Sequence, residues 1–136
     1  MSTDNGSIFD SVLAAVIALA EAQDVYADIL IGALPADNGI SVCVAAGTPT
    51  YYHDKGVDYE MTLALNGKHS SQQSVSGALG RIHHALGTMK SYPTTDDGCQ
   101  ITSIETVSLP AYLDRESNRQ WLYGSSLRVR FYKPKG

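Results

Sequence analysis

The stretch VDYEMTLALNGKHSSQQSVSGALGRIHHALG, residues 57–87, contains two hydrophobic periodicities in succession. Its first part alternates apolar and polar residues, which is typical of a strand with one buried face. The apolar members are Val57, Tyr59, Met61, Leu63 and Leu65. Its second part repeats apolar residues every three or four positions, which predicts a helix with one apolar stripe. These are Val75, Leu79, Ile82, Leu86 and Met89. We expect this strand and this helix to form the core on which the rest of the chain packs.

Turn and cap residues predict the boundaries of these two elements. Asn66-Gly67 predicts the end of the strand. Ser70 with Gln73 matches a capping box at the start of the helix, and Gly87 suits the left-handed position at its end.

Length and composition indicate one soluble domain. The 136 residues suffice for a single core, which we place at residues 7–136, after a polar segment, 1–6, that we expect to be disordered. Only 18% of the residues are charged, which is low for a soluble protein and favours self-assembly. The apolar run Val12–Ala20 is too short to cross a bilayer and follows acids rather than bases, so neither a membrane anchor nor a signal peptide is expected.

The two cysteines predict no disulfide framework. Cys43 lies in an apolar run, where a buried free thiol is the commonest state, and Cys99 is the other cysteine. A reducing cytoplasm is therefore the default compartment.

Four further elements complete the expected fold. Residues 7–23 repeat apolar pairs every four positions, which predicts an amphipathic helix capped by Ser7 and Asp10. Strands are expected at 40–47, at 100–109 and, with a bulge near Gly124, at 121–132. The intervening segments are expected to be loops: a connector at 24–39, a polar hairpin loop at 48–56, and a connection at 111–120 after Pro110 ends its strand.

This order of elements, α-β-β-α-β-β, predicts an α+β fold. Two hairpins separated by a helix favour a two-layer sandwich, in which two helices pack on one face of a four-stranded, mainly antiparallel sheet.

The charges are distributed unevenly along the chain. Residues 1–60 contain nine acids and one base, whereas residues 61–136 contain five acids and nine bases. Such asymmetry can reflect nucleic-acid contact, but the bases are scattered. Head-to-tail association of copies explains the pattern at least as well.

No pattern of residues predicts a catalytic, cofactor or metal site. Neighbouring helical residues such as His83 and His84 point about 100° apart and so cannot chelate one metal as an i, i+4 pair does. Asn66-Gly67-Lys68-His69 lacks both the earlier glycine and the Ser or Thr of a phosphate-binding loop. Asp96 and Asp97 fall in a loop, where solvated carboxylates are the simpler reading. We therefore expect a protein that is not an enzyme.

Several segments together resemble the tail-terminator proteins of long-tailed bacteriophages and their prophage relatives, including the family described as minor capsid protein from bacteriophage. The likeness covers roughly Ser7 to Tyr132. It is carried by the first helix leading to ISVCVAAG (40–47), by YEMTLAL (59–65) before a glutamine-containing helix start, by the strand ending in Ser108-Leu109-Pro110, and by the aromatic strand 121–132.

The resemblance implies a structural protein without an active site, cofactor or metal. Proteins of this family form rings, commonly of six subunits, that cap the tail tube, stop its polymerisation and join it to the head connector, while DNA passes through without specific recognition. The implied partners are further copies of the chain, the tail tube protein and the connector protein, with no membrane. The implied location is the tail or neck of a virion that is assembled in the bacterial cytoplasm.

We expect the subunit contacts of such a ring at the loop 48–56 and the connection 113–120, together with the basic last strand. The expected interface residues are Tyr51, Tyr52, His53, Arg115, Arg119, Arg128 and Arg130. The alternative function is a small ligand-binding or enzymatic module that uses the 48–56 loop and the nearby sheet face.

Overall fold

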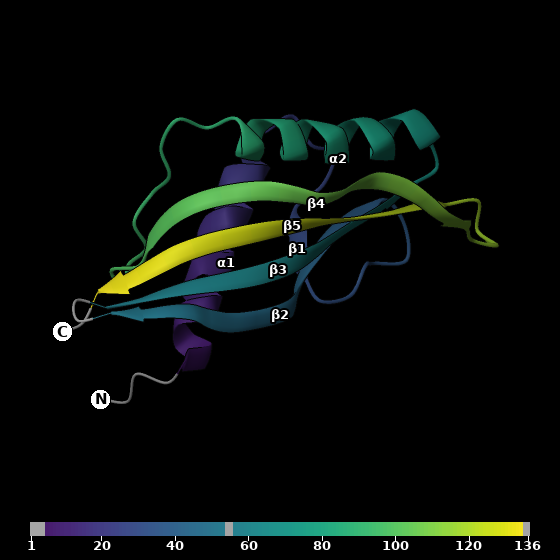
Figure 1. Ribbon diagram of the computed structural model, residues 1–136. Coiled ribbons are helices and arrows are strands. Elements are labelled where there is room, and N and C mark those ends of the chain that lie inside the picture. The colour runs from purple at the N-terminus through teal and green to yellow at the C-terminus, as the bar shows by residue number, and fades with distance from the viewer. Residues whose placement is uncertain (1–4, 54–55, 135–136) are drawn as a thin grey trace.

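Two helices pack on one face of a five-stranded sheet (Figure 1). The computed structural model describes the backbone of residues 5–53 and 56–134 and the side chains of residues 8–49 and 56–134. The elements are α1 (Asn5–Glu21), β1 (Ile29–Ile31), β2 (Gly39–His53), β3 (Gly56–His69), α2 (Gln72–Gly87), β4 (Gln100–Arg115) and β5 (Trp121–Pro134). The strand order is β1-β2-β3-β5-β4, so β3 and β5 lie inside the sheet while β1 and β4 form its edges.

The α+β class and the placement of both helices on one face are confirmed, but the predicted four-stranded sheet lacked one strand. β1 pairs in parallel with β2, with Ile29 opposite Ile40, and this makes the sheet mixed. The segment was predicted to be a connector because three residues are too few to display an alternating pattern.

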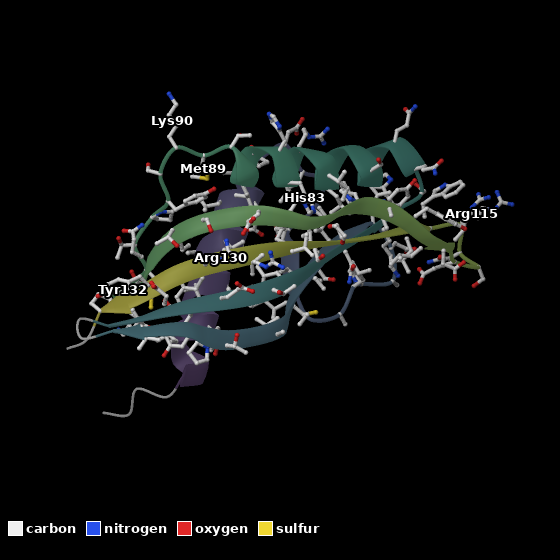
Figure 2. All side chains as sticks on the ribbon, in the orientation of Figure 1. His83, Met89, Lys90, Arg115, Arg130 and Tyr132 are labelled. Carbon is white, nitrogen blue, oxygen red and sulfur yellow. The ribbon has the colours of Figure 1, made fainter. Side chains whose placement is uncertain are left out.

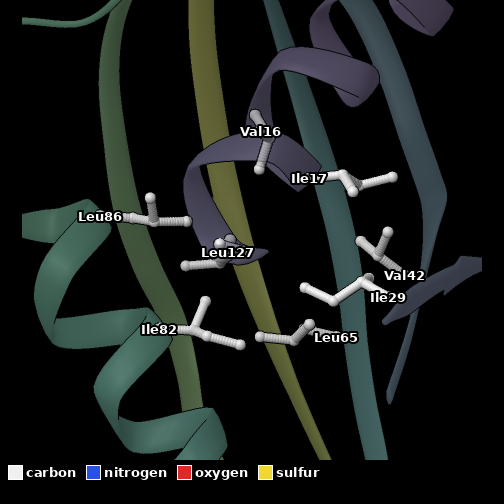
Figure 3. Close-up of a pocket in the computed structure, with 9 residues that line it drawn as sticks. Val16, Ile17, Ile29, Val42, Leu65, Ile82, Leu86 and Leu127 are labelled. Carbon is white, nitrogen blue, oxygen red and sulfur yellow. The ribbon is translucent and has the colours of Figure 1, made fainter. Parts of the chain in front are cut away.

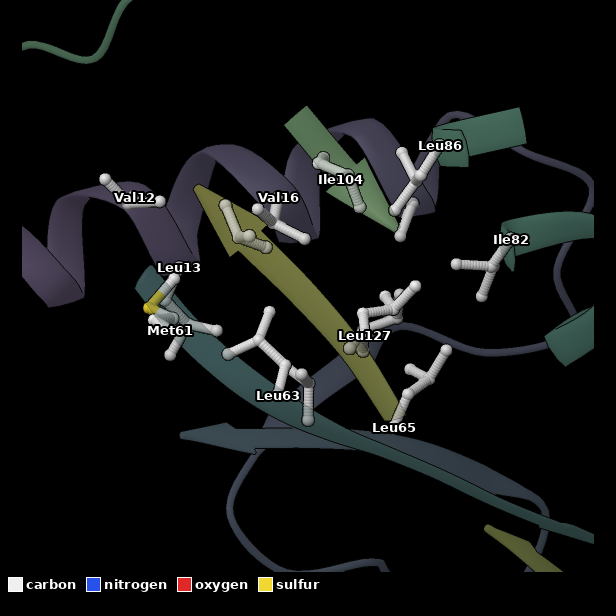
Figure 4. Close-up of a cluster of buried hydrophobic side chains, with 14 of the residues drawn as sticks. Val12, Leu13, Val16, Met61, Leu63, Leu65, Ile82, Leu86, Ile104 and Leu127 are labelled. Carbon is white, nitrogen blue, oxygen red and sulfur yellow. The ribbon is translucent and has the colours of Figure 1, made fainter. Parts of the chain in front are cut away.

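The core lies between the sheet and the two helices (Figure 4). The odd-numbered residues of β3 and β5 point into it, and so do the predicted stripes of both helices. From the strands these are Tyr59, Met61, Leu63, Leu65, Leu127, Val129 and Phe131; from the helices, Ile8, Val12, Leu13, Val16, Val75, Leu79, Ile82 and Leu86. Burial of each such large apolar side chain stabilises the folded state by roughly 1.5–3 kcal/mol relative to exposure to water. The period-two and period-3.6 readings of the sequence are thus confirmed.

The irregularities of the sheet are concentrated in β2 and β4. The β3–β5 pairing runs without interruption from Gly56 opposite Pro134 to His69 opposite Trp121. The β4–β5 register shifts four times and the β2–β3 register twice, and each shift places the extra residue in β4 or β2. The bulge predicted near Gly124 is therefore wrong, because the extra residues lie in the neighbouring strand.

Both predicted loops beside these strands were too long. Pro110 does not end its strand: β4 continues to Arg115, because an edge strand tolerates a missing N–H at a bulge. The turn of this hairpin lies within residues 116–120. Residues 48–53 belong to β2 rather than to a loop, and the tip residues 54 and 55 lie outside the described residues.

Two local sequence signals, a turn and a helix cap, do not lie where they were predicted. β3 continues through Asn66-Gly67 to His69, and Gly67 serves close packing instead of a turn, because a Cβ there would come within 2.9 Å of Val75. The cap of α2 is Ser71, whose side chain accepts from the Ser74 N–H, so the predicted cap was one residue early.

The remaining predicted helix boundaries also shift. Gly87 is the last residue of α2 and does not have a positive φ; Thr88 is the C-cap. Helix α1 begins at Asn5 rather than Ser7, and residues 1–4 of the segment predicted to be disordered lie outside the described residues.

The buried face of β3 should dominate the free energy of unfolding. We expect Leu63→Ala to lower it by about 2–5 kcal/mol, because the fully buried side chain leaves a cavity in a close-packed core. The matched change Leu109→Ala, at a side chain that is 71% exposed, should shift it by less than about 0.5 kcal/mol. Urea denaturation at low protein concentration measures both, and equal losses would contradict this description of the core.

Candidate functional site

Polar groups, two of them buried, hold the turn of the β4–β5 hairpin against the end of β3 and against the connection between β1 and β2. The Lys68 ammonium lies 2.6 Å from a carboxylate oxygen of Glu116, and only 8% of the lysine side chain is exposed. The amide oxygen of buried Gln120 accepts a hydrogen bond from the Asn38 N–H at 2.7 Å. We call Lys68, Glu116, Gln120 and Asn38 the latch; it fixes the far end of the hairpin relative to the sheet.

His83 is buried between α2 and the β4–β5 hairpin (Figure 2). Its Nδ1 lies 2.8 Å from the Thr106 hydroxyl, and its Nε2 lies 2.8 Å from the Ser125 hydroxyl. Ser125 in turn donates to the Leu65 carbonyl at 2.8 Å. Since the Ser125 proton is used in that bond, Nε2 carries a proton and donates, and Nδ1 accepts from Thr106. Burial lowers the pKa of His83, which favours this neutral form.

This Thr106–His83–Ser125 chain does not have the arrangement of a nucleophilic site. The Ser125 hydroxyl is buried and its proton is committed to a backbone carbonyl. A serine nucleophile instead requires its proton to face the histidine base. The two hydroxyl groups therefore satisfy both ring nitrogens of the buried His83 side chain.

The sheet face opposite the helices carries a cluster of four charged residues. Arg130 on β5 contacts Glu60 on β3 at 3.3 Å and Glu105 on β4 at 2.6 Å, so it links three strands. The Arg128 Nε lies 3.3 Å from Glu60, an ion pair by distance, yet this nitrogen makes no hydrogen bond. All four side chains are 30–47% exposed, and such pairs typically contribute only about 0–1 kcal/mol each.

The outer part of the β4–β5 hairpin, residues 107–123, extends past the end of α2, and we call it the arm (Figure 1). Aromatic contacts brace it: Tyr112 packs edge-on against Trp121 at 5.9 Å and against Tyr123 at 6.2 Å. The Arg115 guanidinium lies 4.7 Å from the centre of the Trp121 ring, at the far end of the hairpin (Figure 2). Most of the β4 side chains of the arm are nevertheless exposed.

The cavity enclosed in the core is too small to bind a ligand. It measures about 10 Å³ and is lined only by apolar residues of both helices and the sheet, among them Val16, Ile82 and Leu127 (Figure 3). A space of this size barely admits one water molecule, and water also requires polar partners. Two open surface depressions, of about 450 and 630 Å³, lie beside the α2–β4 connection.

No metal site is found among the described residues. No group of three or more histidine, cysteine or acidic side chains could hold a metal ion there. Cys43 is free but only half-buried, which corrects its prediction as a buried thiol; Cys99 is free and buried, and burial raises the pKa of its thiol. In the same part of the chain, no helix combines the length and apolar character that spanning a bilayer requires.

The residues predicted to form an interface do not converge on one site. The backbone of Tyr51, Tyr52 and His53 pairs with the start of β3, and their side chains lie outside the described part. Arg115 and Arg119 lie at the opposite end of the sheet, near the hairpin turn, whereas Arg128 and Arg130 lie between these two ends.

Sequence reasoning missed three features of these surfaces. The latch and the partners of His83 each bring together residues from distant segments. The apolar side chains of the arm come from one segment, in which Val107 and Leu109 belong to the predicted strand and Tyr112 and Leu113 to the predicted connection. This run of apolar residues could have pointed to a longer strand.

Protonation of His83 should destabilise the fold. The unfolded state binds a proton below about pH 6.5. In the folded state, burial lowers the pKa of His83, so the folded protein binds this proton only at lower pH. The free energy of unfolding should therefore fall as the pH drops below about 6.5. Urea denaturation at pH 7.5 and at pH 5.0 should show a smaller decrease for His83→Gln than for wild type. The exposed neighbour provides the control, because His84→Gln should retain the wild-type decrease; identical pH dependence in all three proteins would contradict the assignment.

The latch should be sensitive to loss of its carboxylate. Glu116→Gln should lower the free energy of unfolding by about 1–3 kcal/mol, since it leaves the buried Lys68 charge without a counterion. The double change Lys68→Met with Glu116→Gln should recover part of this loss, because no buried charge remains. A double variant less stable than the single one in urea denaturation would show that the ion pair itself is strongly stabilising.

Comparison with known proteins gives a match in fold. No protein-family model and no curated protein matches the sequence. Among solved structures, the chain is similar to a chain of the "Virion of native gene transfer agent (GTA) particle", with a TM-score of 0.64 and 13% sequence identity. The alignment covers 93% of this chain and 98% of the other, so the two share the fold of the whole domain.

Proposed function

We propose that this chain is a structural protein of a phage-type virion. The observation that carries the proposal is the likeness to a chain of a gene transfer agent virion over nearly the full length of both chains. The polar groups inside the fold agree with a structural role, because the hydroxyl and imidazole groups around His83 are committed to one another.

Within that class, we propose that the chain is a tail terminator. Copies would form a ring, commonly of six, that caps the tail tube and joins it to the head connector, and the chain would therefore occupy the tail or neck after assembly in the host cytoplasm. The resemblance of its segments to tail-terminator proteins supports this role. The acidic first part and the more basic second part support head-to-tail contacts, in which one patch binds a different patch on the neighbour.

The predicted interface residues remain part of this proposal. Tyr51, Tyr52 and His53 would contact a neighbour from one end of the sheet, and Arg115 and Arg119 from the other.

The basic residues of β5 belong to the same proposed interface. Arg128 and Arg130 already pair with Glu60 and Glu105 within the subunit. Reversing their charge would therefore disturb the fold's own ion pairs as well as a contact.

The alternative is a small binding or enzymatic module built on residues 48–56 and the nearby sheet face. Residues 48–53 continue β2, and the side chains of residues 50–55 lie outside the described part of the chain. The three cavities described above are lined by residues elsewhere in the described part.

Deletion of the gene from the element that carries it tests the proposed role. We expect particles with tail tubes of uncontrolled length and no attached heads, because nothing would stop polymerisation or join the connector. Electron microscopy measures tail length and head attachment, and a plasmid copy of the wild-type gene should restore both. Tails of normal length with heads attached would refute the terminator role.

Light scattering of the purified chain should also detect a species near six times 14.6 kDa.

A further inference from the structure

The exposed large apolar side chains of the described residues all lie on the edges of the sheet. Elsewhere in that part of the chain, large apolar residues are buried or half-buried. The exposed set is Leu30, Ile31, Val44, Val107, Leu109, Tyr112 and Leu113. Leu109 is the most exposed of them, at 71%, and Ile31 follows at 67%. Their concentration on the two edges of the sheet favours an interaction role, whereas scattered exposed apolar residues need no explanation.

These side chains form two groups on opposite edges. Leu30 and Ile31 lie on β1, and Val44 lies on β2 just beyond the residues that β1 covers; we call these three the β1 edge surface. The other four lie on β4, the opposite edge, and we call them the arm surface. Because three strands separate the two surfaces, one subunit cannot cover its own arm with its own β1 edge.

The charged side chains beside the two surfaces can pair between copies. Asp28 immediately precedes β1, and it is exposed and without an ion pair among the described side chains. Asp24 is exposed as well, but its backbone carbonyl accepts two hydrogen bonds from the Arg81 guanidinium, so this edge also carries a cation.

The arm presents two exposed cations, Arg115 and Arg119. Asp114 lies beside them, and the Asp37 carboxylate accepts a hydrogen bond from Asn118 of the hairpin turn. An arginine on the arm of one copy can therefore pair with Asp28 of another copy.

A contact at the arm would be made by side chains rather than by an added strand. Four extra residues interrupt the β4 register, and Pro110 lies within the arm. Bulges and prolines of this kind prevent regular pairing with a further strand and so block indiscriminate aggregation. They leave the apolar side chains accessible, and the aromatic bracing of Tyr112 and Trp121 holds the arm in position for docking.

We propose that the arm surface of one copy packs against the β1 edge surface of the next copy, in a heterologous contact. This contact rests on the proposed function, in which copies of the chain form a ring, and it identifies the two surfaces through which neighbouring copies would bind. Each subunit then uses its arm on one neighbour and its β1 edge on the other, which is the connectivity of a ring.

Cross-linking tests the pairing directly. In a background of Cys43→Ser and Cys99→Ala, one variant carries Ile31→Cys and another Leu109→Cys. With a short bismaleimide, the equimolar mixture should yield a covalent dimer, while each variant alone should remain at the background level. A chain that carries both cysteines should yield a ladder of covalent oligomers. A dimer from Leu109→Cys alone, as strong as that of the mixture, would overturn the heterologous contact.

A second measurement follows assembly without cross-linking. Leu109→Asp should weaken self-association at least about tenfold in light scattering over a concentration series, because it places a charge in an apolar contact. The matched control is His84→Asp on the exposed side of α2, which should associate like wild type. Circular dichroism and thermal melting should show that both variants are folded.

The outcomes separate this proposal from the proposed function. If wild type forms rings but the mixture gives no dimer and Leu109→Asp assembles normally, the edge contact is wrong and the ring stands. If wild type remains monomeric over the whole series, the ring itself is contradicted, and the edge contact with it.

Discussion

The fold depends on one constraint: β3 and β5 each have a single apolar face, and both faces point to the same side of the sheet. Their uninterrupted pairing fixes that register, because a shift by one residue would turn Leu63 or Leu127 toward solvent. Both helices must therefore cover the same side. The opposite side is left to the charged cluster around Arg130, and the edges are left to strands that tolerate irregularity.

Sequence reasoning succeeded where a long periodic pattern met a buried surface. The alternation in β3 and the apolar stripes of α1 and α2 follow from which side chains are buried, so the core residues of these elements could be predicted from the sequence. It failed where a single residue was read as a local signal. Gly67 and Pro110 both suggested breaks, but the first provides room for Val75 and the second occupies an edge bulge. Neither role is visible until the neighbouring element is known.

The candidate surfaces were less predictable than the core for the same reason. His83 belongs to the predicted helix, but its hydrogen-bond partners come from β4 and β5, far along the chain. Likewise, the arm surface becomes a feature only once the strand order places β4 on an edge. The sequence predicts that the strand ends at Leu109 and that Leu113 belongs to a connection, because Pro110 and the polar residues after it conceal the rest of the strand.

The position of β5 has a consequence for how the chain acquires its structure. β5 lies inside the sheet, yet it is synthesised after every other described element, and its pairs with β3 span more than a third of the chain. Until it arrives, β3 has an open edge and the helices have half a sheet to cover. Formation of the core must therefore wait for contacts between residues far apart in sequence, which is the condition for slow, cooperative folding rather than stepwise growth from the ribosome.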